Sequence, residues 1–158
     1  LKKDNPKMHL VVIGNYKKNG HTERLIKKLG IEQDVIFKKN ISKDEIKKLY
    51  SSSSIAIVSS LYEGFGYPVI EAMSCEVPII ATNVSSIPEL VSDFGTLIEP
   101  KNEDQLKKSI IKVMQNYDHF KDIAIKGRQH VIETFNWSKI TSEYEKIIYE
   151  TVDRFKKC

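Results

Sequence analysis

The chain has 158 residues, of which 41% are hydrophobic and 29% are charged, and its formal net charge is +4. These values are ordinary for a soluble globular protein with a hydrophobic core. Because the lysines are spread among acidic residues, they indicate a solvated surface and not a nucleic-acid-binding face. No apolar run approaches the ~18 residues that a membrane-spanning helix needs, and no signal peptide is recognisable.

The cysteines and histidines predict no metal site. Cys75 and Cys158 form neither a CxxC pair nor another metal-binding spacing, and the four histidines show no ligand spacing either. This cysteine usage fits a reduced, cytoplasmic setting, and we expect Cys75 to be a small core residue.

Strand and helix patterns alternate along the chain. Short apolar runs predict buried strands at 9–14, 34–37, 55–58, 78–82 and 95–98. Periodic apolar residues, capping residues and prolines predict helices at 22–29, 42–50, 68–74, 86–91, 103–115, 119–134 and 138–155. The alternation predicts an α/β fold with a mostly parallel sheet that helices cover on both faces. Ligands of such sheets bind beyond the carboxyl ends of the strands.

Two helix boundaries have specific signals. Ser42 and Glu45 have the spacing of a capping box, in which a hydroxyl and a carboxylate bind free N–H groups at a helix start. Gly30 follows a helical pattern and predicts a helix stop. The serines at 51–54 are too few for a linker, so we interpret them as a helix end.

Residues 63–71 follow the third predicted strand and read Glu-Gly-Phe-Gly-Tyr-Pro-Val-Ile-Glu. The carboxylates of Glu63 and Glu71 can accept hydrogen bonds from hydroxyl groups. Between them, glycines allow a ligand to come close, and the helix that begins near Pro68 points its N–H groups at an anion. The stretch therefore predicts a nucleotide-sugar site. Glycoside hydrolysis by the two carboxylates is the less favoured alternative, because they flank a phosphate-type turn.

Several blocks in the same order resemble the C-terminal, donor-binding domain of GT-B fold glycosyltransferases of family 4 (glycosyl transferases group 1). The resemblance runs from about His9 to Tyr149 and includes 63–73, 77–82, 87–91, the strand after Gly95, and 135–138. It implies a Rossmann-like domain of a hexosyltransferase that moves a sugar, with retention, from a nucleotide-sugar to an acceptor hydroxyl. The implied pathway is polysaccharide, glycan or glycolipid biosynthesis, with no metal and no cofactor.

The resemblance also implies a role for individual residues. Glu63 matches the first glutamate of the E-x7-E motif, which contacts the donor sugar, and it is the predicted catalytic residue. Glu71 matches the second glutamate, which holds the ribose. The turn whose backbone N–H groups reach sugar and phosphate corresponds to Gly64, Phe65, Gly66 and Tyr67. A loop whose backbone lines the base corresponds to Asn40 and Ile41.

Plainer interpretations remain open for several of these side chains. Glu71 can be a favourable acid in the first turn of a helix. Phe65 and Tyr67 fit equally well as core anchors. Glu89 is interpreted as a residue that caps or buttresses the following turn, with a ligand role as the alternative.

Three departures from the family pattern shape further expectations. Glu76 stands where the family has glycine, so it is disfavoured if the position needs a positive φ and harmless in a tolerated turn. The family's strand that ends in Gly-Arg, and a nearby lysine, have no match, and we do not assign their diphosphate role to Lys2, Lys3 or Lys7. The N-terminal acceptor domain has no match either.

We therefore predict a single donor-binding domain over 1–158 that lacks its first strand and is inactive alone, with the missing acceptor domain as its partner. The gap in the sheet predicts closure or self-association.

In the terminal helix, 137–155, an apolar face is short of cover or packs on the local core; it contains Ile140, Tyr144, Ile147, Ile148 and Val152. The parent enzyme is cytoplasmic, with a peripheral membrane location as the alternative. The other candidate functions are a non-catalytic nucleotide-sugar-binding module and a non-transferase GT-B enzyme such as an epimerase.

Overall fold

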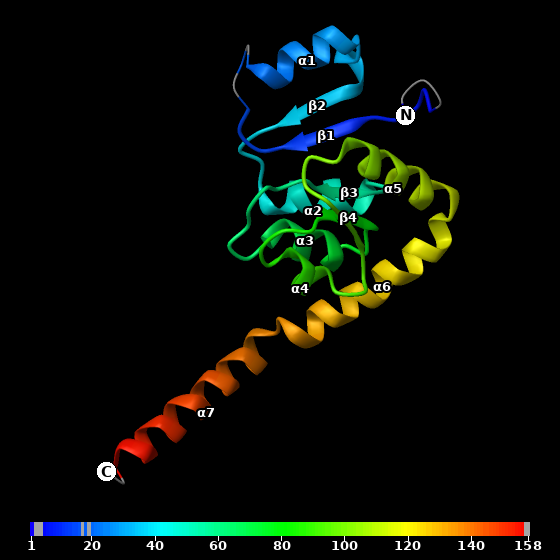
Figure 1. The fold of residues 1–158 in the computed structure, drawn as a ribbon. Helices are drawn as coiled ribbons and strands as arrows, with labels where there is room; N and C mark the ends of the chain where they lie inside the picture. Colours follow the sequence, from blue (N-terminus) through cyan, green and yellow to red (C-terminus); the bar gives the residue numbers. More distant parts are fainter. Residues whose placement is uncertain (2–4, 17, 19, 157–158) are drawn as a thin grey trace. The chain divides into compact units, whose positions relative to one another are not determined.

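The structure is a computed structural model that describes residues 1, 5–16, 18 and 20–156. Internal contacts divide the chain into two compact units, Leu1–Lys48 and Leu49–Cys158 (Figure 1). Every strand and helix that the sequence predicts is found among the described residues, with boundaries shifted by a few residues at most. The single donor-binding domain stays a prediction.

The first unit contains a two-stranded parallel sheet. Its elements, with the helix that leads into the second unit, are β1 (Leu10–Ile13), α1 (His21–Leu29), the 3-10 helix η1 (Glu32–Asp34), β2 (Val35–Lys38) and α2 (Lys43–Ser52). The register places Leu10 opposite Val35 and Ile13 opposite Lys38. Such a sheet has too few neighbours to bury both faces, so the predicted burial of these strands is wrong: Leu10 is 49% exposed and Ile13 is 40% exposed.

Both predicted helix-boundary signals are confirmed in this unit. Gly30 ends α1 in the left-handed conformation, with φ at 65°, and its N–H donates to the carbonyls of the last turn. At the start of α2, the Glu45 N–H donates to Ser42 Oγ at 3.2 Å, and the Ser42 N–H donates to Glu45 Oε2 at 2.9 Å. The hydrogen bonds from the Ser42 backbone and hydroxyl lower the pKa of Glu45.

The second unit is a three-stranded parallel sheet with helices around it. Its elements are β3 (Ala56–Val58), α3 (Tyr67–Ser74), β4 (Ile79–Thr82), α4 (Ile87–Val91), β5 (Thr96–Ile98), α5 (Glu103–Gln115), α6 (Tyr117–Thr134) and α7 (Trp137–Lys156). The strand order is β3-β4-β5, and all four residues of the central strand β4 are buried. Helices α3 and α4 pack on β4, α5 packs on β4 and β5, and α3 also packs on α6 (Figure 1).

The strands form two sheets, one in each unit, and every pair is parallel, so the predicted α/β fold with parallel strands is confirmed. Among the described residues, hydrogen-bonded ladders join β1 to β2, and β3 to β4 and β5, but none joins the two sets. Closure of the gap and self-association both stay predictions.

The core of the second unit lies between the sheet and the helices of α3 and α4. Its largest side chains with almost no exposure belong to Met73, Ile87, Val69 and Val91. Ile80 of β4 and Val113 of α5 are equally buried but lie outside this cluster. Cys75 is half-buried and packs against this core, whereas Cys158 lies outside the described residues. No helix in the described part of the chain is both long enough and apolar enough to cross a bilayer.

Glu76 occupies a strained position directly after α3. Its φ is 56°, so the first alternative for this residue is confirmed. The Glu76 N–H donates to the Met73 carbonyl at 3.0 Å, and the Val77 N–H donates to the Ala72 carbonyl at 3.3 Å. These two bonds form a Schellman motif, in which the position of Glu76 normally belongs to glycine.

Two cations of α6 hold this helix end in place. Lys121 Nζ donates to the Glu76 carbonyl at 2.7 Å and lies 3.8 Å from the Glu76 carboxylate. Arg128 Nη1 donates to the Ser74 carbonyl at 2.8 Å, and its Nε lies 3.6 Å from the same carboxylate. Positive charge at the end of α3 also complements the helix dipole.

The apolar face of α7 lacks cover, as one of the two alternatives predicted. No residue of α7 is buried, and Tyr144, Ile147, Ile148 and Val152 are all exposed, while Ile140 is half-buried. Packing of this face on the local core is therefore wrong.

Replacing Glu76 tests whether backbone strain or ion pairing dominates at this position. Both Glu76→Gly and Glu76→Ala remove the carboxylate, but only alanine retains the left-handed strain of ~1–2 kcal/mol. Because glycine also gives the unfolded chain more freedom, we expect E76A to be less stable than E76G by about 1 kcal/mol in urea unfolding. At exposed Lys108, inside α5, the order should reverse, with glycine the less stable by about 1 kcal/mol. Equal stability of the two Glu76 variants would contradict this account.

Candidate functional site

The site predicted from sequence lies at the carboxyl edge of the three-stranded sheet. Because β3, β4 and β5 are parallel, their carboxyl ends at Val58, Thr82 and Ile98 share one edge. The predicted stretch at 63–71 begins shortly after Val58, as the rule for ligand sites in such sheets requires.

Glu63 is half-buried, and a hydroxyl fixes its carboxylate. Ser60 Oγ donates to Glu63 Oε1 at 2.6 Å. The Ser60 carbonyl in turn accepts a bond of 2.6 Å from Thr82 Oγ1. Thr82 is the last residue of β4 and is only 2% exposed. The central strand therefore anchors the segment that presents Glu63.

The turn between the two carboxylates has one conformationally demanding glycine. Gly66 is buried with φ at 102°, and a Cβ there would lie 2.9 Å from Leu90 Cδ1. Gly64 is exposed, and a Cβ there would meet nothing within 4 Å. Ser86 Oγ donates to the Phe65 carbonyl at 2.8 Å and to the Glu63 carbonyl at 3.2 Å. The start of α4 thus holds the turn from outside.

Glu71 lies on the exposed side of α3. The first turn of α3 contains no acidic residue, so the interpretation of Glu71 as a first-turn acid is wrong. Tyr50 OH, nearby, donates to the Pro68 carbonyl at 3.4 Å. Burial, followed by the negative charge of Glu71, raises the pKa of Tyr50 to about 12. Glu71 is thus an exposed residue of α3, the helix that begins at the end of the turn.

The two aromatic residues of the turn differ in their surroundings. Tyr67 is 69% exposed, so it is not a core anchor. Phe65 is 40% exposed and packs with its ring edge against Phe135, with the centroids 5.8 Å apart. Phe65 and Tyr67 also contact each other, with their ring centroids 5.1 Å apart. Glu89 is exposed in the first turn of α4, where an acidic residue favours the helix start.

The remaining predicted residues belong to the first unit or lie outside the description. Asn40 and Ile41 lie between β2 and α2, and Asn40 has a positive φ of 53°. Because they belong to the unit Leu1–Lys48, their contact with the base stays a prediction. Lys2 and Lys3 lie outside the described residues.

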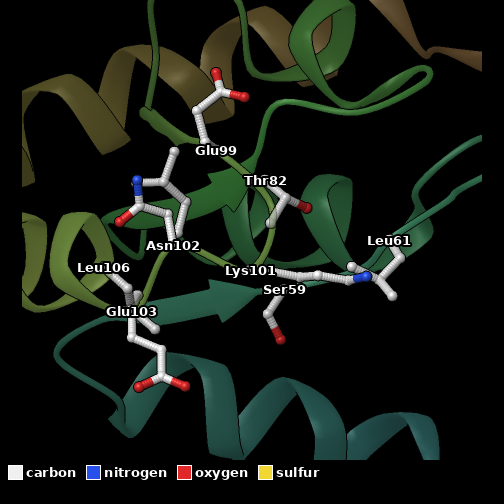
Figure 2. A pocket seen from close by; sticks show the side chains of 9 residues that line it. Ser59, Leu61, Thr82, Glu99, Lys101, Asn102, Glu103 and Leu106 are labelled. Atoms are coloured by element: carbon white, nitrogen blue, oxygen red, sulfur yellow. The ribbon is translucent and has the colours of Figure 1, made fainter.

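A cavity of about 350 Å³ opens at the same edge of the sheet (Figure 2). Its lining comes from the ends of all three strands and the start of α5: Ser59, Leu61, Thr82, Ile98, Glu99, Lys101, Asn102, Glu103 and Leu106. In Figure 2 the Lys101 side chain extends toward Leu61. None of the residues predicted for the donor lines this cavity, and we assign it no role.

Sequence reasoning missed the three hydroxyl residues that hold the site together. Ser60, Thr82 and Ser86 contribute bonds to the segment around Glu63. The only signal was their place, at or near the end of a strand or just before a helix, and hydroxyls there commonly bond only their own turn. Within the described ranges, no group of three or more His, Cys, Asp or Glu residues is arranged to hold a metal ion.

Comparison with known proteins gives a clear family match. The family of glycosyl transferases group 1 matches residues 1–130. The chain is 29% identical over 154 residues to the MMP alpha-(1->4)-mannosyltransferase of Mycolicibacterium hassiacum. That match covers 96% of this chain and 38% of the mannosyltransferase, so the chain spans well under half of the length of this relative.

Two solved structures agree with the family match. One is the C-terminal domain of the glycosyl transferase group 1 family protein LpcC from Francisella tularensis, with a TM-score of 0.74 and 28% identity, covering 86% of this chain and 74% of that domain. The other is Anabaena HepE in complex with UDP-glucose, with a TM-score of 0.80 and 22% identity, covering 92% and 42% of the two chains. At that identity, HepE supports the fold alone. The chain therefore belongs to the glycosyl transferases of group 1 and has the α/β architecture of the GT-B glycosyltransferases.

Proposed function

We propose that this chain is the donor-binding half of a retaining, family 4 hexosyltransferase that moves a sugar from a nucleotide-sugar to an acceptor hydroxyl. The observation that carries the proposal is the fixed Glu63 carboxylate beside the turn that opens α3, at the carboxyl edge of the sheet. The group 1 family match supplies the chemistry of sugar transfer. Polysaccharide or glycolipid biosynthesis, in the cytoplasm and without a metal, belongs to the same proposal.

In this proposal, each part of the E-x7-E motif contacts a different part of the donor. Glu63 accepts hydrogen bonds from the donor sugar, and Glu71, exposed on α3, accepts them from the ribose. The N–H groups of 64–67 approach the phosphate, which the open space around Gly64 permits. The dipole of α3 adds only ~0.3–1 kcal/mol at an exposed helix end, so it steers the anion while the turn holds it.

The comparisons support a nucleotide-sugar as the donor. HepE, which shares the fold, was solved with UDP-glucose, and the relative from Mycolicibacterium hassiacum is named a mannosyltransferase. LpcC supplies a C-terminal domain of similar extent to this chain. We infer that the acceptor side of the reaction cleft belongs to a second domain. On this proposal the chain alone binds the donor and does not transfer the sugar.

Calorimetric titration of the chain with UDP-glucose, GDP-mannose and ADP-glucose tests the proposal. We expect at least one of the three to bind below millimolar concentration, without a divalent cation. The same mixtures should release no free sugar or nucleotide over time. Absence of binding by all three at millimolar concentration would refute the donor site, and turnover by the chain alone would refute the half-site.

Removal of the Glu71 carboxylate should weaken nucleotide binding. A hydrogen bond to an ionised carboxylate is worth roughly 1.5–3 kcal/mol. We therefore expect Glu71→Ala to raise the dissociation constant of the bound nucleotide about 10- to 100-fold, measured by calorimetry. Glu89→Ala is the matched control, because this exposed glutamate also lies on a short helix at the same edge. Equal losses in both variants, or none in E71A, would contradict the ribose role.

Alanine variants of the two glycines in the turn test two different effects, one on stability at Gly66 and one on ligand binding at Gly64. Gly66→Ala places a side chain at φ of 102° and should cost ~1–2 kcal/mol of unfolding free energy. Gly64→Ala meets nothing within 4 Å, so its stability should stay within ~0.5 kcal/mol of the parent. If phosphate approaches the backbone there, G64A still weakens nucleotide binding. Thermal unfolding and calorimetry of both variants check this, and a destabilised G64A with a stable G66A would contradict it.

A further inference from the structure

The carboxylate of Glu63 is already held before any ligand arrives. Its Oε1 accepts a bond of 2.6 Å from Ser60 Oγ, a length typical of a hydroxyl that donates to an ionised carboxylate. Both side chains are half-buried at the carboxyl edge of β3. A glutamate with one oxygen fixed has lost most of its freedom of rotation, while its second oxygen still has acceptor capacity.

Ser60 is itself fixed by the hydrophobic core. Its carbonyl accepts the bond of 2.6 Å from Thr82 Oγ1, and Thr82 is 2% exposed at the end of the fully buried strand β4. On the other side, Ser86 Oγ donates to the carbonyls of Glu63 and Phe65. Hydroxyls from β4 and from the start of α4 therefore fix the backbone on both sides of the Glu63 side chain.

We propose that Ser60 is a positioning residue for the donor sugar, acting through Glu63. Ser60 holds Oε1, so that Oε2 is presented in one orientation to a sugar hydroxyl. A group fixed in advance loses less freedom on binding, so the sugar gains affinity while the nucleotide does not. This inference rests on the proposed function, because it needs Glu63 to contact the sugar.

A bond that only closes the turn would have a different signature from a positioning bond. A purely structural Ser60 would affect nucleotide and nucleotide-sugar equally, through the shape of the turn. A positioning Ser60 affects only the additional binding affinity that the sugar contributes beyond that of the nucleotide. The ratio of the dissociation constants of UDP and UDP-glucose measures this additional affinity, whatever the affinity for UDP itself is. The ratio for GDP and GDP-mannose measures it for a guanine nucleotide.

The experiment measures this ratio by calorimetry for the full chain and its variants. The net value of such a bond predicts that Ser60→Ala shifts the ratio about 3- to 10-fold against the sugar, with UDP affinity unchanged within about twofold. Ser60→Thr, which keeps the hydroxyl, should restore the ratio. Ser59→Ala is the matched control, because Ser59 is the adjacent hydroxyl residue, is exposed, and is not the residue that donates to Glu63 Oε1. In the Glu63→Gln background, S60A should shift the ratio less, because the two residues act as one unit.

The outcomes separate the two levels of the proposal. If none of UDP-glucose, GDP-mannose and ADP-glucose binds the parent chain, the proposed function fails and the role of Ser60 fails with it. If they bind and S60A leaves the ratio unchanged, or changes UDP and UDP-glucose equally, only the positioning role is overturned. Circular dichroism reports whether S60A folds, and if it does not, Ser60→Cys provides the same measurement with a side chain of similar shape and weaker donation.

Discussion

The burial of β4 is the constraint on which the second unit depends. All four of its residues are buried, it is the central strand of the sheet, and α3, α4 and α5 pack against it. Apolar burial of this kind is the main favourable term in folding, and it fixes the strand far more firmly than any surface contact can. Thr82, the last residue of the strand, donates a hydrogen bond to the Ser60 carbonyl and so holds a segment of the surface against this fixed strand. The candidate site is therefore an extension of the core.

Local sequence signals predicted the elements well because each signal acts over a few residues. The capping box at Ser42 and Glu45 and the left-handed stop at Gly30 are formed by groups within one helical turn. The local structure at 63–71, a turn followed by a helix, was also predictable from its glycines and proline, whereas the donor-binding role of its carboxylates stays a prediction. Its position after β3 then followed from the general rule for parallel sheets.

Features that depend on distant partners were not predictable from local patterns. The exposure of Leu10 and Ile13 follows from the number of strands beside them, which a strand's own residues do not encode. Ser86 reaches back 21 residues to the Phe65 carbonyl, and Thr82 reaches back 22 residues to the Ser60 carbonyl. Glu76 shows the same limit, because Lys121 and Arg128, which hold its helix end, come from a helix far along the chain.

The exposed start of α7 contains an intrinsic fluorescence probe. Its single tryptophan, Trp137, is the first residue of α7 and is 78% exposed. Its indole ring is therefore in water while the core of the second unit is intact, and its fluorescence emission reports the surroundings of α7 and not the packing around β4. Unfolding of the core changes this emission little, whereas any surface that covers the start of α7 moves it to shorter wavelength.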